Sequence, residues 1–526
     1  MSRVDIATAI ALLTSGAGCG SAFTTTEMAS SDAMSTYAEP NAAPPADEAD
    51  AGGDAPPERE EDLRVLMPAQ TDVYLFVPNP SRSTVTRVDV YTMAVDTAPV
   101  GAEPAEVLTT PDYRTAVIFN EGDDTVTLMD ASSLESQTVA IRPNMNRMVM
   151  SPDGAWVVLW HDLAAEEDDD IVDGLLSYNE VSFVEVATGT FHAMAVGQFP
   201  HGVEFTPDGQ LAVVVSDDSL ALVDLTADVL QPEMVQVAED LLDPSPAEEV
   251  LLTPEGRFAF VRQFGAVDLT VVDLHTLQVD RIPAGDNPTD LDLLPDGSGC
   301  VVVARDSAEL WLYDLDDPMA AAEVLPLPTE LTIGSVSFDP TGRIALLYSN
   351  AVLEARYATW DLATNEVVTR SLEKPIDTLS ITPSGDNALI FHTLDNDPDA
   401  DPSSPFYGAH ALTMIDLWDF RTTPVTMPDA LLEYANSTEG TYAFFAMEDT
   451  PLLGVLDWST LIADQVDLSS NPVHVGVVPD ISPGDDDEPP AWVSQEHELG
   501  RLSFYDTDDG SLRTITGFEL NSQIEQ

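Results

Sequence analysis

The sequence predicts an all-β fold made of repeated four-stranded units, and two observations carry that prediction. First, one unit recurs along the chain: an apolar run, a turn of the form Pro-Asp-Gly, a second run, a third run ending near Val-x-Asp-Leu, and a fourth run. Second, these runs are short and rich in strand-forming residues, with no helical stretches between them. Four short antiparallel strands per unit describe the blade of a β-propeller.

The Pro-Asp-Gly turn is suited to joining the first two strands of a unit. Proline presets φ at the first corner, aspartate bonds the downstream backbone, and glycine takes the positive φ that returns the chain. The clearest turns are Thr110-Pro111-Asp112, Ser151-Pro152-Asp153-Gly154, Thr206-Pro207-Asp208-Gly209, Thr253-Pro254-Glu255-Gly256, Leu294-Pro295-Asp296-Gly297, Asp339-Pro340-Thr341-Gly342 and Thr382-Pro383-Ser384-Gly385. Weaker versions stand at Met67-Pro68-Ala69, Ser437-Thr438-Glu439-Gly440 and Val478-Pro479-Asp480.

The turns mark ten units of about 45 residues, with successive intervals of 43, 41, 55, 47, 41, 45, 43, 55 and 41 residues. Ten exceeds the usual four to eight blades of a propeller. The ring is therefore predicted to have seven to ten blades. Either it is one ten-bladed ring made by doubling five units, or a seven- or eight-bladed ring with a partial second assembly.

The units resemble the YVTN-type blades of bacterial surface-layer and lactonase-like propellers. In such blades a Gly-x-x-Pro start precedes the first strand, as at Gly101 to Pro104, Gly197 to Pro200 and Gly285 to Pro288. The resemblance covers about Leu63 to Phe518. It implies a propeller domain over residues 63–520 with a short tail, 521–526, and it is weak on function, because such propellers include scaffolds, receptors and enzymes.

The N-terminus resembles a bacterial lipoprotein signal over residues 1–19. Arg3 precedes an apolar stretch from Ile6 to Leu13, and small residues lead to Cys19, which the resemblance makes the site of lipidation. Residues 20–62 are rich in Ser, Thr, Ala, Pro, Asp and Glu and are predicted to form a disordered tether. These features predict a lipid-anchored protein of the cell envelope, periplasmic or at the cell surface, with plain secretion as the alternative.

The composition excludes two classes of partner. The chain of 526 residues carries 93 Asp and Glu against 19 Lys and Arg, a net charge of −74, and Lys374 is its one lysine. Nucleic acids and anionic membrane surfaces are bound by basic side chains, so the only membrane contact expected is through the N-terminal lipid. An acidic surface with so little lysine also resembles proteins of salt-adapted organisms, in which the charge reflects habitat and not a partner.

Two long acidic insertions mark the candidate ligand side of the ring. The first runs from His161 to Tyr178 and contains Glu166 to Asp170; the second runs from His392 to His410. Long loops inside a compact repeat are often functional. Aspartates alternate in the second insertion, an arrangement of hard oxygen ligands that suits calcium: Asp395, Asp397, Asp399 and Asp401. The alternative is a solvated acidic loop.

Histidines concentrate in the predicted ligand-side loops. The candidates are His161, His201, His392, His410 and His474. A transition-metal or catalytic cluster requires that two to four of these histidines converge. His201 and His474 are the better central candidates, because they follow Pro200 and Pro472 by one and two residues and are predicted to start innermost strands. The alternative is that these polar side chains never meet. The tryptophans are predicted to be blade core, and Cys300, in an apolar run, a small buried residue.

The function predicted from these features is a binding scaffold for an unidentified protein or small ligand. No serine-hydrolase elbow, His-Glu-x-x-His, Cys-x-x-Cys or phosphate-binding glycine loop occurs. The alternative is a propeller hydrolase of lactonase type, with or without a divalent metal. No cofactor other than calcium is expected.

Overall fold

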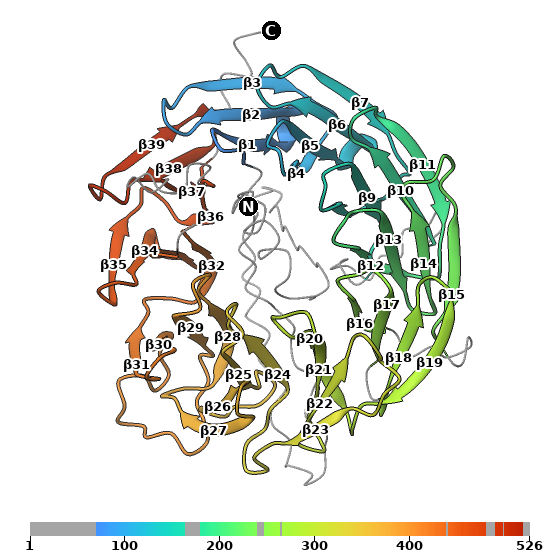
Figure 1. Ribbon diagram of the computed structural model, residues 1–526. Helices are drawn as coiled ribbons and strands as arrows, with labels where there is room; N and C mark the ends of the chain where they lie inside the picture. The colour runs from blue at the N-terminus through green and yellow to red at the C-terminus, as the bar shows by residue number, and fades with distance from the viewer. Residues whose placement is uncertain are drawn as a thin grey trace, which may run out of the picture.

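The computed structural model is a ring of ten β-sheets around a central axis (Figure 1). It describes residues 70–163, 179–238, 247–263, 266–437, 440–479, 490–497 and 499–518. Each sheet is one blade, numbered 1 to 10 in chain order, and its strands follow each other from the ring centre to the periphery (Figure 1). The predicted all-β propeller is confirmed, and the open question of blade number is answered by ten.

The strands of blades 1 to 5 are β1 (Tyr74–Asn79), β2 (Thr84–Asp89), β3 (Val95–Pro99); β4 (Pro104–Thr109), β5 (Thr115–Asn120), β6 (Thr125–Asp130), β7 (Ser136–Ala140); β8 (Arg147–Met150), β9 (Trp156–Trp160), β10 (Glu180–Glu185), β11 (Thr190–Ala195); β12 (Pro200–Phe205), β13 (Leu211–Ser216), β14 (Ser219–Asp224), β15 (Pro232–Gln236); β16 (Ala247–Leu252), β17 (Phe258–Gln263), β18 (Asp268–Asp273) and β19 (Gln278–Pro283). Those of blades 6 to 10 are β20 (Pro288–Leu293), β21 (Gly299–Ala304), β22 (Glu309–Asp314), β23 (Glu323–Pro326); β24 (Ser335–Phe338), β25 (Ile344–Tyr348), β26 (Arg356–Asp361), β27 (Glu366–Ser371); β28 (Ile376–Ile381), β29 (Asn387–His392), β30 (Ala411–Asp416), β31 (Thr422–Thr426); β32 (Leu431–Asn436), β33 (Tyr442–Met447), β34 (Leu452–Asp457), β35 (Ile462–Asp467); β36 (Pro472–Val477), β37 (Ala491–Gln495), β38 (Arg501–Tyr505) and β39 (Leu512–Thr516). Two short 3-10 turns, η1 (Pro80–Arg82) and η2 (Glu121–Asp123), follow β1 and β5.

The Pro-Asp-Gly turns join the first and second strands, as predicted. In blade 4 the hydroxyl of Thr206 donates to Asp208 Oδ1 at 2.7 Å and accepts from the backbone N–H of Leu211 at 3.1 Å. Gly209 has a φ of 67°, the left-handed conformation that closes the turn. In blade 1 the equivalent turn is closed by the Thr71 N–H bonding Tyr74 O at 2.7 Å, a few residues after the sequence mark at Pro68.

The Val-x-Asp-Leu motif has a structural cause at the other turn of the same end. The aspartate that closes the third strand accepts hydrogen bonds from backbone N–H groups two or three residues later, as Asp130 does from Ser132 at 3.1 Å and Ser133 at 2.7 Å. These bonds lower the pKa of Asp130 to about 2. Because the folded-state pKa is depressed, the contribution of this group to stability is present above its unfolded pKa and is lost as the pH falls toward 2.

The hydrophobic core is divided among the junctions between blades. Ten clusters of buried residues lie in the described part of the chain, and each joins two neighbouring blades. The tenth junction joins the ends of the chain: Leu75 and Val88 of blade 1 pack with Trp492 and Phe504 of blade 10. The ring is therefore closed by packing of the same kind that joins every other pair of blades.

Gln70 fastens this closure. Its side-chain amide contacts blade 10 through Val477 O, and its Oε1 accepts from Trp492 Nε1 at 2.8 Å. Its own carbonyl accepts from Thr109 Oγ1 of blade 2 at 2.8 Å. Blade 1 has three strands among the described residues, and Gln70 lies shortly before the first of them. Through these contacts the buried Gln70 joins blades 10, 1 and 2 at the point where the ring closes.

Most tryptophans are buried or half-buried in the blades, but for Trp418 the prediction of blade core is wrong. Its side chain is 67% exposed because it lies in the turn between β30 and β31 and not in a strand. Cys300 is fully buried, and burial raises the pKa of its thiol, which agrees with the predicted small buried residue. None of the helices in the described residues is long and apolar enough to cross a membrane. Cys19 and the predicted tether lie outside the described residues.

Candidate ligand-binding site

The two acidic insertions emerge on the same face of the ring. Each connects the second and third strands of its blade: the first lies between β9 and β10 of blade 3, and the second between β29 and β30 of blade 8. Residues 164–178 of the first, which include the run Glu166 to Asp170, lie outside the described residues. The second insertion is described completely, and we refer to its face of the ring as the insertion face.

Lys374, the single lysine of the chain, holds the second insertion in place. Its side chain is 1% exposed, and its Nζ donates to Leu394 O at 2.9 Å and to Asn396 Oδ1 at 3.4 Å. Asn396 Oδ1 also accepts from the backbone N–H of Gly408 at 2.9 Å, which ties the two ends of the insertion together. Burial lowers the pKa of Lys374, while the charge of Asp395 opposes this effect. A buried cation thus organises the most acidic described loop.

The alternating aspartates are used, in part, as backbone acceptors. Asp397 Oδ1 accepts from the N–H of Asp399 at 2.8 Å, and its Oδ2 accepts from the N–H of Ala355 in blade 7 at 2.9 Å. Asp401 Oδ1 accepts from the backbone and hydroxyl of Ser403, which lowers the pKa of Asp401. Across the described residues, no group of three His, Cys, Asp or Glu side chains is placed to hold a metal ion. Calcium would have to share these carboxylates with their backbone donors.

A cavity of about 320 Å³ opens on the insertion face between blades 7, 8 and 9. This volume lies within the range of small-molecule sites. Polar groups of His392, His410, Asp377 and Asp395 line it together with apolar side chains. Leu353 and Leu394, which are 44% and 51% exposed, are the most exposed apolar side chains of this lining. The cavity lining therefore mixes polar and apolar side chains.

His392 is the buried polar group of this cavity. It ends β29, with Nδ1 3.0 Å from Pro375 O and Nε2 2.7 Å from Thr413 Oγ1. Burial lowers its pKa to about 4, and the nearby charge of Lys374 adds to the effect. The imidazole is therefore neutral at pH 7 and both ring nitrogens bond within the blade, which favours a structural and positioning role for His392 over proton transfer.

We expect His392 to make the protein lose stability in mild acid. The unfolded chain takes up a proton near pH 6.5 and the folded one only near pH 4, so the folded state is penalised as the pH falls through this window. The penalty between pH 7 and pH 5 is about 2 kcal/mol. Urea unfolding of His392→Gln at both pH values should show a correspondingly smaller loss than the unchanged protein; an equal loss would mean that His392 does not titrate in this way.

The other predicted histidines are not gathered into one cluster. His410 lines the same cavity as His392, with Nε2 4.0 Å from Asp429 Oδ1. His161 lies on blade 3, where its Nδ1 is 2.6 Å from Asn144 O. Of the five candidates, the structure thus brings together His392 and His410.

His201 and His474 do not converge, since they lie on blades 4 and 10. Each connects its own innermost strand to that of a neighbouring blade. His201 Nε2 lies 2.8 Å from Ala247 O of blade 5, and its Nδ1 lies 3.6 Å from Asp217, whose pKa is raised by burial. His474 Nδ1 lies 2.6 Å from Glu433 Oε1 of blade 9. His201 and His474 therefore do not form the convergent pair that a catalytic or metal cluster requires.

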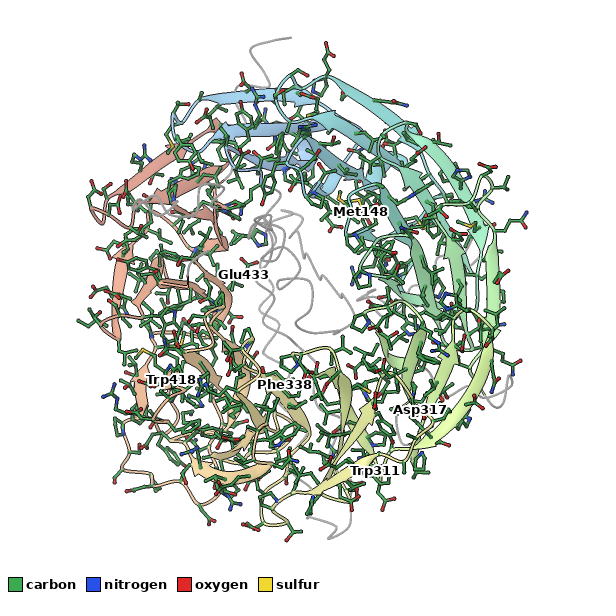
Figure 2. The ribbon with its side chains drawn as sticks, in the orientation of Figure 1. Met148, Trp311, Asp317, Phe338, Trp418 and Glu433 are labelled. Atoms are coloured by element: carbon green, nitrogen blue, oxygen red, sulfur yellow. The ribbon has the colours of Figure 1, made fainter. Side chains whose placement is uncertain are left out.

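Two acids of the innermost strands join blades and were not found from the sequence. Glu433 Oε2 accepts from the N–H of Val475 at 2.7 Å, and Asp290 Oδ2 of blade 6 accepts from the N–H of Val336 of blade 7 at 2.6 Å. Figure 2 shows Glu433 at the inner edge of the ring. Both acids stand two residues after the start of their strand, a position that could have identified them in a chain with fewer acids.

Comparison with known proteins supports the fold alone. No family model matches the chain, and no curated protein matches it. A crystal structure of a eukaryotic initiation factor is 12% identical, with a TM-score of 0.51 over 76% of this chain and 97% of that one. Dihydro-heme d1 dehydrogenase NirN in complex with DHE is 15% identical, with a TM-score of 0.44 over 74% of this chain and 80% of that one. The Cps50 (Swd1) β-propeller domain of Myceliophteria thermophila is 12% identical, with a TM-score of 0.34 over 61% and 98%.

Proposed function

We propose that this chain is a lipid-anchored, extracytoplasmic scaffold of the YVTN-type, lactonase-like kind, which binds a protein or small ligand through the cavity of the insertion face. The observation that carries the proposal is the cavity itself. Its walls come from three blades, and two exposed leucines contribute to its lining. Lys374, the one lysine of the chain, holds the loop beside it in place. The lipoprotein-like sequence ending at Cys19 supports the anchor and the location.

Binding fits the cavity better than hydrolysis does. The ring nitrogens of His392 are engaged by Pro375 O and Thr413 Oγ1, and its pKa of about 4 keeps it neutral at pH 7. Exposed leucines in a pocket of mixed polar and apolar lining suit an inserted side chain or a small molecule with an apolar body.

Site-specific photocrosslinking in the cells that produce the protein tests this proposal. A photoreactive amino acid at Leu394 should capture a discrete partner, seen as a defined mass increase for a protein or a small ligand. The matched position is Met234, which is 46% exposed on the outer strand of blade 4 and should give no such adduct. Ala430→Trp, which fills the cavity, should abolish the Leu394 adduct. Equal adducts at both positions, none at Leu394, or no effect of the filling variant would contradict the proposal.

We also propose calcium as a ligand of the second insertion, through Asp395, Asp397, Asp399 and Asp401. The alternating carboxylates and the ordered course of the loop support it. Calorimetric titration of the full chain should then give binding between micromolar and millimolar calcium, together with a raised Tm. The double variant Asp397→Asn and Asp399→Asn should lose both effects, while Asp464→Asn with Asp467→Asn, on the outer strand β35, should keep them. Absence of heat and of a Tm shift in the unchanged protein would contradict it.

A further inference from the structure

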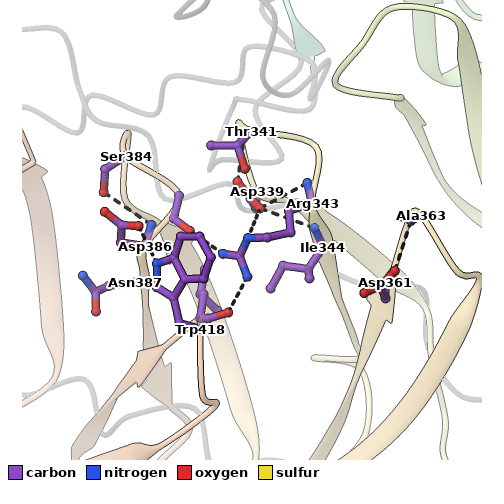
Figure 3. Close-up of polar contacts among 12 residues, drawn as sticks. Asp339, Thr341, Arg343, Ile344, Asp361, Ala363, Ser384, Asp386, Asn387 and Trp418 are labelled. Carbon is purple, nitrogen blue, oxygen red and sulfur yellow. Dashed lines mark hydrogen bonds and ion pairs between the residues drawn. The ribbon is translucent and has the colours of Figure 1, made fainter.

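An exposed tryptophan is held rigidly on the face opposite the insertions. Trp418 lies in the turn between β30 and β31 of blade 8, Asp386 in the turn between β28 and β29, and Arg343 in the turn between β24 and β25 of blade 7. Turns of these kinds lie at the opposite end of the strands from the second-to-third-strand insertions. We call these three residues the Trp418 platform; Figure 3 shows their contacts.

The indole of Trp418 is fixed through one ring face and through its Nε1. The guanidinium of Arg343 stacks on one ring face, 4.1 Å from the ring centroid. Trp418 Nε1 donates to Asp386 Oδ1 at 2.7 Å, and the Trp418 backbone N–H donates to Asp416 Oδ1 at 2.8 Å. The Trp418 side chain is nevertheless 67% exposed, so the ring is fixed while much of its surface faces water.

Arg343 is itself fixed and its charge is compensated. Its Nη1 donates to Leu417 O at 2.7 Å and its Nη2 to Gly385 O at 3.2 Å. Its Nε lies 3.7 Å from Asp339 Oδ2, whose side chain is fully buried. The guanidinium therefore serves as a support for the indole and leaves little uncompensated positive charge at the platform (Figure 3).

The surroundings of the platform are acidic. Asp386 and Asp419 lie in the turns of the platform, while Asp416 and Asp361 are the last residues of β30 and β26 at the same end of the blades. The Asp361 pKa is lowered by hydrogen bonds from Thr364 and Ala363 and by the charge of Arg343, so this group is ionised at neutral pH. The whole chain carries −74. Such a field attracts cations and repels anions, whereas an uncharged ligand gains nothing from it.

We propose that the Trp418 platform docks a basic segment of a partner protein, with an arginine or lysine side chain over the open face of the indole and its charge toward the neighbouring carboxylates. Cations bind the face of tryptophan more strongly than that of the other aromatic side chains. The preformed ring also lowers the cost of ordering on binding. The site is separate from the insertion-face cavity, so its occupant need not be the ligand of that cavity.

The test is titration of the full chain with a short Gly-Arg repeat peptide and with the same peptide carrying citrulline, which has the shape of arginine without its charge. Binding of the arginine peptide should weaken about 3- to 30-fold in Trp418→Ala. It should be unchanged in Val229→Ala, since Val229 is 66% exposed in a comparable turn of blade 4. The citrulline peptide should bind weakly to all three proteins.

Two results would overturn the proposal. Equal affinity of the arginine peptide for the unchanged protein and for Trp418→Ala would assign its binding to the general acidic surface. Binding of a neutral oligosaccharide, such as cellohexaose, that is lost in Trp418→Ala while the arginine peptide is unaffected would make the platform a sugar site. Thermal unfolding of Trp418→Ala should remain cooperative with only a small fall in Tm, because the side chain is exposed and contributes no core packing, and this checks that the fold is retained.

Discussion

Trp492→Ala should lower the free energy of unfolding by about 3–5 kcal/mol, the usual cost of removing a buried tryptophan. Trp492 packs against Leu75, Val88 and Phe504 in the cluster that joins blade 10 to blade 1. It also donates to Gln70 Oε1 across 422 positions of sequence. Because this junction closes the ring, the loss should appear as a lower urea midpoint and a lower Tm for the whole domain.

The control for the loss of ring closure is the same substitution at Trp418, which lies outside the core. Trp418→Ala should cost only about 1 kcal/mol, since the side chain is exposed and loses no core packing but only its stacking on Arg343 and its bond to Asp386. Trp492→Phe should fall between the two variants, because it retains most of the packing and loses the bond to Gln70. If Trp492→Ala were as stable as Trp418→Ala, the ends of the chain would not be joined as the structure shows.

Lys374→Met should release the second insertion while leaving the ring folded. The substitution keeps an apolar side chain of similar length but removes the donors to Leu394 O and Asn396 Oδ1. A buried carbonyl left without its donor costs about 1–3 kcal/mol, and here the cost is concentrated in one loop. Amide hydrogen exchange should therefore become faster in residues 393–410 and stay unchanged in the strands of distant blades.

Arg114→Met is the matched control for this loss of a cation, because the Arg114 side chain is 83% exposed and lies in the β4–β5 turn of blade 2. It should leave exchange in the insertion as it is. Unchanged exchange in residues 393–410 of Lys374→Met would show that other contacts, such as Asp397 with Ala355, suffice to hold the loop.

The repeat made the fold predictable because its signals are local. The turn at Thr206 to Gly209 needs a hydroxyl, an acid and a glycine within four residues, and all three are used in hydrogen bonds or in a positive φ. Counting such turns gave ten units but left the ring at seven to ten blades, and the structure shows ten. Closure of the ring could not be predicted in this way, because the bond between Gln70 and Trp492 joins residues 422 positions apart, and their proximity depends on the geometry of all ten blades.

The candidate site was predictable only in part. The sequence located the second insertion and both histidines of its cavity, His392 and His410, because loop length and residue type are visible in it. It did not identify Lys374 as the anchor, because its partners are a carbonyl and an amide about 20 residues away. The role of acids such as Glu433 in joining blades could not be recognised because acids are abundant in the chain. The exposure of Trp418 was not predicted because this residue lies just beyond the end of a strand.

The most direct test of the central claim, that the anchored second insertion forms the binding surface, is to measure the photocrosslinking yield from Leu394 with and without Lys374→Met. We expect a discrete adduct in the otherwise unchanged protein, a strong reduction in Lys374→Met, and no reduction in Arg114→Met. An adduct of undiminished yield in Lys374→Met, whose insertion exchanges faster, would show that binding does not depend on the surface that the structure describes.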